Sequence, residues 1–117
     1  MFVPVCKQSY LYEGEMVPCM AGTKEILIVW ADGGQPRAFD GICPHGTFPL
    51  SKGMFNGRTL VCPSHNWVFD ARNGHGLSPT GCQIPEYAMK FEDGMVWVDT
   101  DASALSAQCG TDGSGTD

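Results

Sequence analysis

The feature that most constrains this chain is a pair of short segments in which a proline follows a cysteine and a histidine comes soon after. The segment Cys43–His45 reads CPH, and the segment Cys62–His65 reads CPSH. Together they have the spacing C-x-H-x16-C-x2-H. Apolar residues precede each cysteine, so each stands where a strand gives way to a loop. Thiolate and imidazole groups are metal ligands, so the two loops predict a four-ligand metal site.

Two kinds of metal centre use two cysteines and two histidines. One is structural zinc, but zinc fingers typically take both cysteines from one turn and both histidines from a helix. Here each loop supplies one cysteine and one histidine. This division suits two bridged iron ions, because each loop can give its thiolate to one iron and its imidazole to the other. Mixed ligation of this kind defines the Rieske-type [2Fe–2S] centre. Zinc stays open as the alternative.

The residues around the loops resemble those of Rieske-type ferredoxins. The similarity runs from about Lys24 to Thr100 and includes FDARNGHGLSP and IPEYAMKFEDGMVWVDT. It implies an all-β Rieske iron–sulfur fold of short antiparallel strands in stacked sheets. It also implies a small cluster-binding subdomain formed by two loops at about 41–80. One [2Fe–2S] cluster per chain would have its buried iron bound by two cysteines and its outer iron by two histidines. The residues that match are Cys43 and Cys62, and His45 and His65.

Short apolar segments separated by turn signals predict an all-β chain without that resemblance. With 117 residues the chain suits one domain, which we expect to span 1–100. Small polar residues predict a flexible carboxyl-terminal tail over 101–117. The predicted strands are Phe2–Cys6, Glu15–Met20, Lys24–Ala31, Pro36–Asp40, Thr59–Cys62, Trp67–Asp70, Glu86–Phe91 and Met95–Asp99.

Composition excludes several classes of function. The net charge of −6 argues against a nucleic-acid-binding surface and suits docking onto basic partners. The longest apolar run, Ile26–Ala31, is too short to span a membrane, and the first residues show no secretory signal. A cytoplasmic protein, monomeric when free, is therefore expected. In that compartment the six cysteines are metal ligands or free thiols rather than disulfides.

Departures from the high-potential Rieske proteins of respiratory complexes predict a low reduction potential. Those proteins carry a further cysteine in each loop, joined by a disulfide, and two hydroxyl groups near the cluster sulfurs. The matching positions here are Phe48 and Ser64 for the disulfide, and Trp67 and Phe69 for the hydroxyls. Fewer hydrogen bonds to sulfur leave the reduced cluster less stabilised. We therefore expect a potential of roughly −150 mV, which suits reduction from NADH through a flavin.

An electron carrier fits these features better than an enzyme. A Rieske oxygenase needs a second iron held by two further histidines and a carboxylate, and only His75 remains. The resemblance implies a ferredoxin that takes electrons from an NADH-dependent flavin/iron–sulfur reductase. It would pass them to the hydroxylase of a bacterial multicomponent diiron monooxygenase acting on aromatic hydrocarbons or alkenes, since CPSHNWVF, NGHGLSP and IPEY are more similar to that subgroup. The alternatives are the ferredoxin of a Rieske ring-hydroxylating dioxygenase, a structural zinc module and an iron–sulfur regulatory sensor.

Several other residues are assigned to the surroundings of the cluster or to the remaining structure. The candidates for cluster surroundings and partner docking are Pro44, Gly46, Pro63, Trp67 and Pro79. Trp67 has two open interpretations, as a docking aromatic or as a side chain packed beneath the second loop. His75, between two glycines, is expected to be a loop residue. The cysteines expected to be reduced thiols packed as small hydrophobes are Cys6, Cys19, Cys82 and Cys109.

Overall fold

Strand β3 (Lys24–Trp30), rich in Ile, Val and Trp, lies between two hydrophobic cores. Four consecutive residues of this strand, Ile26–Val29, are buried. Side chains alternate between the faces of a strand, so alternate members of this run belong to opposite cores. The neighbouring strand β4 (Pro36–Asp40) divides in the same way, with Phe39 in one core and Ala38 in the other. Strands β3 and β4 therefore separate the two hydrophobic cores of the fold.

The computed structural model describes residues 1–42, 49–63, 67–78, 82–103 and 108–109. Every strand pairing among these residues is antiparallel. The other strands are β1 (Phe2–Lys7), β2 (Met16–Ala21), β5 (Met54–Phe55), β6 (Thr59–Val61), β7 (Val68–Asp70), β8 (Gly76–Ser78), β9 (Cys82–Gln83), β10 (Glu86–Glu92), β11 (Met95–Ser103) and β12 (Gln108–Cys109). Single 3₁₀ turns occur at η1 (Gln8–Tyr10) and η2 (Leu50–Lys52).

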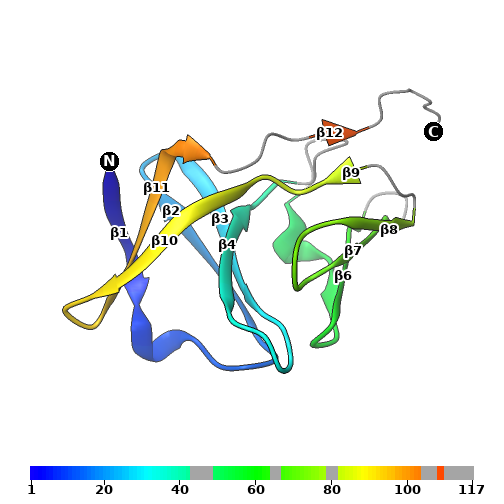
Figure 1. The fold of residues 1–117 in the computed structure, drawn as a ribbon, viewed down its shortest axis with the longest axis horizontal. Coiled ribbons are helices and arrows are strands. Elements are labelled where there is room, and N and C mark those ends of the chain that lie inside the picture. Colours follow the sequence, from blue (N-terminus) through cyan, green and yellow to red (C-terminus); the bar gives the residue numbers. More distant parts are fainter. Residues whose placement is uncertain (43–48, 64–66, 79–81, 104–107, 110–117) are drawn as a thin grey trace.

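Six strands form the larger sheet, in the order β1-β11-β10-β4-β3-β2. Its edge strands β1 and β2 contact each other, so the sheet curls into a nearly closed barrel (Figure 1). Closure of this kind protects strand edges from pairing with other chains. The barrel encloses one core, whose buried members are Leu11, Ala21, Ile26, Ile28, Ala38, Tyr87, Val96 and Val98.

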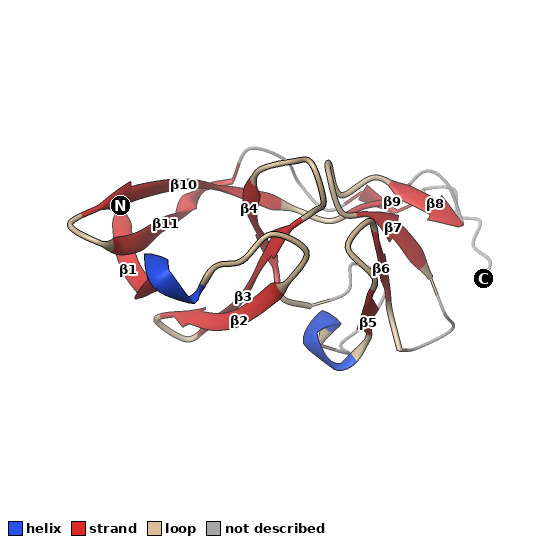
Figure 2. Ribbon diagram, turned by 90° about the horizontal axis from the view of Figure 1, so that it is seen from below, coloured by secondary structure: helices blue, strands red, loops and turns tan. Residues whose placement is uncertain are grey.

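Four short strands form the smaller sheet, in the order β5-β6-β7-β8. Figure 2 shows this sheet at the opposite end of the molecule from β1. It packs on the outer face of β3 and β4 through the second core. The buried members of that core are Leu27, Val29, Ala31, Phe39, Leu50, Leu60, Cys62, Phe69, Ala71 and Ile84. Burying a large apolar side chain stabilises a fold by about 1.5–3 kcal/mol, so this core fixes the smaller sheet to the larger one.

The turn after β7 fits against the larger sheet at Gly74. The φ angle of Gly74 is +79°, in the left-handed region that favours glycine. A Cβ atom at this position would lie 2.9 Å from Cε1 of Phe39 in β4. The N–H of Gly74 donates to the carbonyl oxygen of Asp70 at 2.7 Å, and its own carbonyl accepts the N–H of Ile84 at 2.9 Å. Both conformation and close packing therefore require a glycine here.

The all-β prediction and the stacked sheets are confirmed. Apart from the end of β11, every predicted strand end lies within one residue of the observed one. Strands β5, β8, β9 and β12 were not predicted. No helix in the described ranges is long and apolar enough to cross a membrane.

Two parts of the region predicted as a flexible tail, 101–117, lie in described strands. Strand β11 continues to Ser103, where it pairs with Tyr87, and β12 pairs with β9. Residues 101–103 and 108–109 are therefore strand. Short strands of this kind cannot be recognised in a small polar sequence, because the hydrogen bonds that define them come from the partner strand. Residues 104–107 and 110–117 lie outside the described part of the chain.

Candidate metal centre

The second predicted loop connects strands β6 and β7, which form a hairpin. These strands pair in register along their full length. Beyond them, the N–H of Cys62 donates to the carbonyl oxygen of Trp67 at 2.7 Å. The next residue, Pro63, has no N–H and cannot extend the ladder. The chain therefore leaves the hairpin at Cys62 and returns to it at Trp67.

The first predicted loop is also closed at its base. Ile42 and Pro49 form an isolated antiparallel bridge, and the N–H of Leu50 donates to the carbonyl oxygen of Gly41 at 2.7 Å. The N–H of Gly41 in turn donates to the carbonyl oxygen of Glu25 in β3, at 2.9 Å. Both ends of the segment that contains the CPH motif are thus attached to the larger sheet.

Asp40, the last residue of β4, orients the start of the first loop. Its Oδ1 accepts the N–H of Ile42 at 3.1 Å, and its Oδ2 accepts the Tyr87 hydroxyl at 3.2 Å. The Nζ of Lys24 lies 3.7 Å from the same Oδ2. Burial raises the pKa of the Tyr87 phenol, so this hydroxyl stays protonated and continues to donate. One carboxylate thus links the entrance of the loop to β3 and β10.

The bases of the two loops pack against each other at Gly53, the residue after η2. A Cβ atom on Gly53 would collide with the carbonyl oxygen of Val61 and would lie 3.2 Å from Cδ of Pro63. Leu50, three residues earlier, is fully buried in the same core as Cys62. The chain leaving the first loop therefore lies directly against the chain entering the second.

Cys62 is a predicted ligand that the structure describes. Its side chain is completely buried and its thiol is not part of a disulfide. It shares the core with Leu60, two residues earlier, because strand side chains alternate. A free thiol at the mouth of one loop, beside the end of the other, fits the donor chemistry of a [2Fe–2S] cluster with a buried iron. The predicted site residues outside the described part are Cys43, Pro44, His45, Gly46, His65 and Pro79.

Two further predicted neighbours, Trp67 and Pro63, are described. Trp67 is partly buried and packs against the core that contains Cys62, in agreement with the packing interpretation. Pro63 is exposed. Met54, which pairs with Val61 in the adjacent strand, is 74% exposed. Apolar side chains are therefore exposed beside the base of the second loop.

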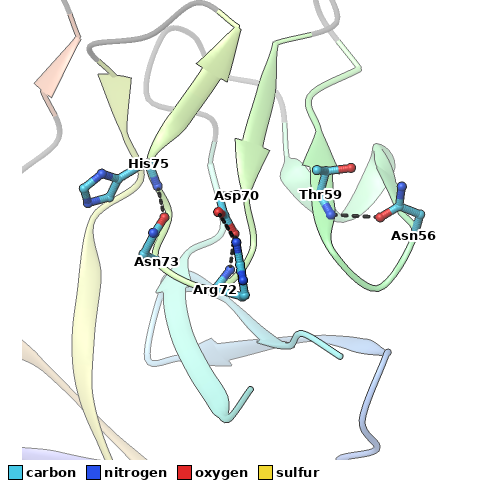
Figure 3. Close-up of polar contacts among 6 residues, drawn as sticks. All are labelled: Asn56, Thr59, Asp70, Arg72, Asn73 and His75. Carbon is cyan, nitrogen blue, oxygen red and sulfur yellow. Dashed lines mark hydrogen bonds and ion pairs between the residues drawn. The ribbon is translucent and has the colours of Figure 1, made fainter. Parts of the chain in front are cut away.

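Polar side chains close the turns of the smaller sheet (Figure 3). Asn56 Oδ1 accepts the backbone N–H of Thr59 at 2.8 Å, and Asn73 Oδ1 accepts that of His75 at 2.9 Å. The imidazole of His75 is exposed and points away from Asp70 in Figure 3. His75, expected to be a loop residue, lies outside the named strands and forms an isolated antiparallel bridge with Gln83, and its ring is exposed.

Asp70 and Arg72 form an ion pair at the end of β7. Oδ1 of Asp70 accepts the backbone N–H of Arg72 at 2.9 Å and its Nε–H at 3.3 Å, and Oδ2 accepts from Nη2 at 3.2 Å. These side-chain hydrogen bonds hold the pKa of the Asp70 carboxyl below its ordinary value. The pair stiffens the turn that leads toward β8.

The family model of the Rieske [2Fe-2S] domain matches residues 1–88, which include the bases of both loops. The chain belongs to this family. Membership implies a Rieske [2Fe–2S] cluster as the cofactor, and the buried free thiol of Cys62 is consistent with it.

Three relatives show where this Rieske chain stands in the family. The ferredoxin component of the alkene monooxygenase system of Xanthobacter autotrophicus is 34% identical over 101 residues, 86% of this chain and 82% of that protein. The ferredoxin component of the naphthalene 1,2-dioxygenase system of Pseudomonas putida is 32% identical over 92 residues, 78% and 88% of the two chains. The solved structure of the Sphingomonas yanoikuyae B1 ferredoxin superposes with a TM-score of 0.71 at 27% identity, covering 84% of this chain and 97% of that one. All three are ferredoxins rather than catalytic subunits.

Three residues that build the Rieske site were not predicted: Asp40, Leu50 and Gly53. Asp40 carries a usable signal, because an aspartate at the end of an apolar strand often accepts a backbone N–H two residues on. Gly53 and Leu50 carry no such signal in the sequence. Their roles arise from contact with β6 and Cys62, which are close only in the folded chain.

Proposed function

We propose that this chain carries single electrons from an NADH-dependent flavin/iron–sulfur reductase to the hydroxylase of a bacterial diiron monooxygenase. That hydroxylase would act on aromatic hydrocarbons or alkenes. The observation that carries the proposal is the 34% identity, across most of both chains, to an alkene monooxygenase ferredoxin component. The segments CPSHNWVF and IPEY support the same subgroup.

Within this proposal, Cys43 and Cys62 bind the buried iron, and His45 and His65 bind the outer iron. The bound cluster supplies a one-electron redox couple. The chain itself supplies rigidity and exclusion of water. Cys62 is held by its backbone hydrogen bond and surrounded by apolar side chains, so its sulfur moves little and meets no solvent. A rigid site needs less reorganisation on electron transfer.

A second candidate function is the ferredoxin of a Rieske ring-hydroxylating dioxygenase. The 32% identity to a naphthalene dioxygenase ferredoxin component favours it almost as strongly. Both functions use the same cofactor and the same kind of reductase. They differ in the surface of the acceptor, so only the acceptor can separate them.

The deciding experiment reconstitutes electron transfer from purified components. The chain, a flavin reductase and NADH are combined with a diiron hydroxylase and an alkene or toluene, or with a ring-hydroxylating dioxygenase and naphthalene. Product that rises with the concentration of this chain only in the diiron assay supports the proposal. Product only with the dioxygenase assigns the second function.

Matched variants and metal analysis complete this test. His65→Ala should abolish transfer, whereas Thr23→Ala, in the exposed turn between β2 and β3, should leave it unchanged. Two irons per chain and a red-brown colour are expected. A colourless protein that contains zinc would contradict both ferredoxin functions.

A further inference from the structure

Two cysteines outside the candidate metal centre meet at the seam of the barrel. The seam is the line along which the edge strands β1 and β2 contact each other. Cys6 lies in β1 and Cys19 lies in β2. Both are free thiols, and both are partly buried against the barrel core. The topology therefore brings two thiols together from the two edges of one sheet.

A β-bulge in β1 turns Cys6 toward this core. In the pairing with β11, the register shifts between Pro4 and Cys6, so that Cys6 lies opposite Val96. Val96 is fully buried, and directly opposed residues share a face. Without the additional residue of the bulge, Cys6 would lie opposite Met95 and its side chain would belong to the other face. The bulge thus gives the thiol its inward position.

Cys19 has the corresponding position on the other edge. It pairs with Ile26 of β3, which is buried in the barrel core. Each thiol shifts the pKa of the other, and both pack against the same core, so the two side chains are neighbours across the seam. Cys6 is only partly buried, so a small reagent can approach it from solvent.

The two thiols differ in acidity. Burial raises the pKa of both, and that of Cys19 rises to about 12. The interaction with Cys19 offsets part of this effect on Cys6, whose pKa still stays above its ordinary value. Cys6 is therefore the thiol that ionises first. Because the thiolate is the nucleophile, Cys6 attacks and Cys19 completes the reaction, and both are slow to react at neutral pH.

We propose that Cys6 and Cys19 form a reversible disulfide site that locks the barrel seam in the presence of a low-molecular-weight disulfide such as oxidised glutathione. The Cys6 thiolate attacks one glutathione sulfur, the glutathione S–S bond breaks, and one glutathione thiolate leaves. Cys19, as thiolate, then attacks the Cys6 sulfur and displaces the second glutathione. The cysteine pair loses two electrons and two protons, and the two glutathione molecules gain them. Excess reduced glutathione reverses the reaction.

The test uses the full-length, cluster-loaded protein in buffers of defined glutathione redox ratio. Free thiols are alkylated, and the protein is digested with trypsin without reduction. Lys7 separates the two cysteines into different peptides. We expect the peptide with Cys6 linked to the peptide with Cys19, lighter than their sum by two hydrogen atoms. The initial rate should rise about tenfold per pH unit from pH 7.

A stability measurement tests whether the disulfide holds strands β1 and β2 together. The cross-link closes the chain between Cys6 and Cys19, and a loop of this length predicts a rise in Tm of roughly 10 °C in the oxidised protein. Glutathione attached separately to each cysteine, or a Tm that does not rise, would overturn the proposal. Cys6→Ser and Cys19→Ser should each abolish the linked peptide, whereas the control Cys109→Ser should retain both the linkage and the Tm shift. The peptide map of the unmodified chain needs no variant and decides the outcome if a variant fails to fold.

Discussion

The backbone N–H of Cys62 donates to the carbonyl oxygen of Trp67, at 2.7 Å, across the mouth of the second loop. This bond uses the backbone of Cys62 and leaves its buried thiol available. The position combines a fixed main chain with a free donor atom, which is what a rigid metal ligand requires.

The first prediction concerns that thiol. Cys62→Ala keeps the backbone hydrogen bond but removes the sulfur, so the purified variant should contain almost no iron and lack the visible absorption of the parent. Iron analysis and an absorption spectrum check this. Cys109→Ser, which removes a thiol outside both loops, serves as the control and should contain as much iron as the parent. Full iron content in Cys62→Ala would remove Cys62 from the ligand set.

The second prediction concerns the contact between the loop bases. Gly53→Ala introduces a methyl group against the carbonyl oxygen of Val61, and overpacking of this kind costs about 1–3 kcal/mol of unfolding free energy. Urea unfolding should show that loss, together with a lower iron content. Gly34→Ala is the matched control, because its methyl group would lie at an ordinary 3.4 Å from the carbonyl oxygen of Ala31. Equal midpoints for the two variants would show that Gly53 is not a tight contact.

The third prediction is a pH dependence. Arg72 lowers the pKa of Asp70 in the folded chain, so the ionised carboxylate stabilises the fold above the ordinary carboxyl pKa of about 3.9. This stabilisation is lost as the pH falls through the lowered value. Arg72→Gln should therefore be less stable than the parent at pH 6, and the difference in unfolding free energy should shrink below about pH 4.

Urea midpoints from pH 3 to 7 measure this difference. Repeating the substitution in an Asp70→Asn background is the control, since no carboxylate remains to be stabilised there. A difference that stays constant over the whole pH range would show that Arg72 acts through packing rather than through the Asp70 charge.

The fourth prediction concerns the reduction potential. Phe69 is fully buried in the same core as Cys62, so Phe69→Tyr introduces a hydroxyl close to a proposed sulfur ligand. A new hydrogen bond contributes about 1 kcal/mol, which is about 40 mV for a one-electron couple. Voltammetry should show a potential higher by that amount. Phe91→Tyr, in β10 and outside the core that contains Cys62, should leave the potential unchanged, and equal shifts in both variants would refute a local effect.

The sequence predicts the long strands well because their own side chains specify them. The segments Lys24–Trp30 and Pro36–Asp40 have apolar centres that are buried on both faces, and turn residues bound them. Strands such as Met54–Phe55 are two residues long and exist because the hairpin beside them offers hydrogen bonds. The extension of β11 to Ser103 has the same origin, since Tyr87 of β10 supplies its partner.

The residues of the candidate site also differ in whether the sequence could predict them. Cys62 could be predicted from the CPSH motif, because the thiol of a cysteine is itself a metal ligand. Gly53 could not, because its importance lies in the backbone of Val61, which approaches it only after folding. Trp67 lies between these cases: its position beside the loop could be predicted, but the choice between packing and exposure needed the core around it.

The arrangement of the two sheets at opposite ends has a practical consequence for handling the protein. The α-amine of Met1 lies at the end of β1, where it pairs with Asp99 at 2.8 Å, and Figure 2 shows this end far from the smaller sheet. Coupling the protein to a bead or sensor chip through that amine would orient every molecule alike. The end that carries Cys62 would then face the solution, so that reductases and hydroxylases could be captured without obstruction by the support.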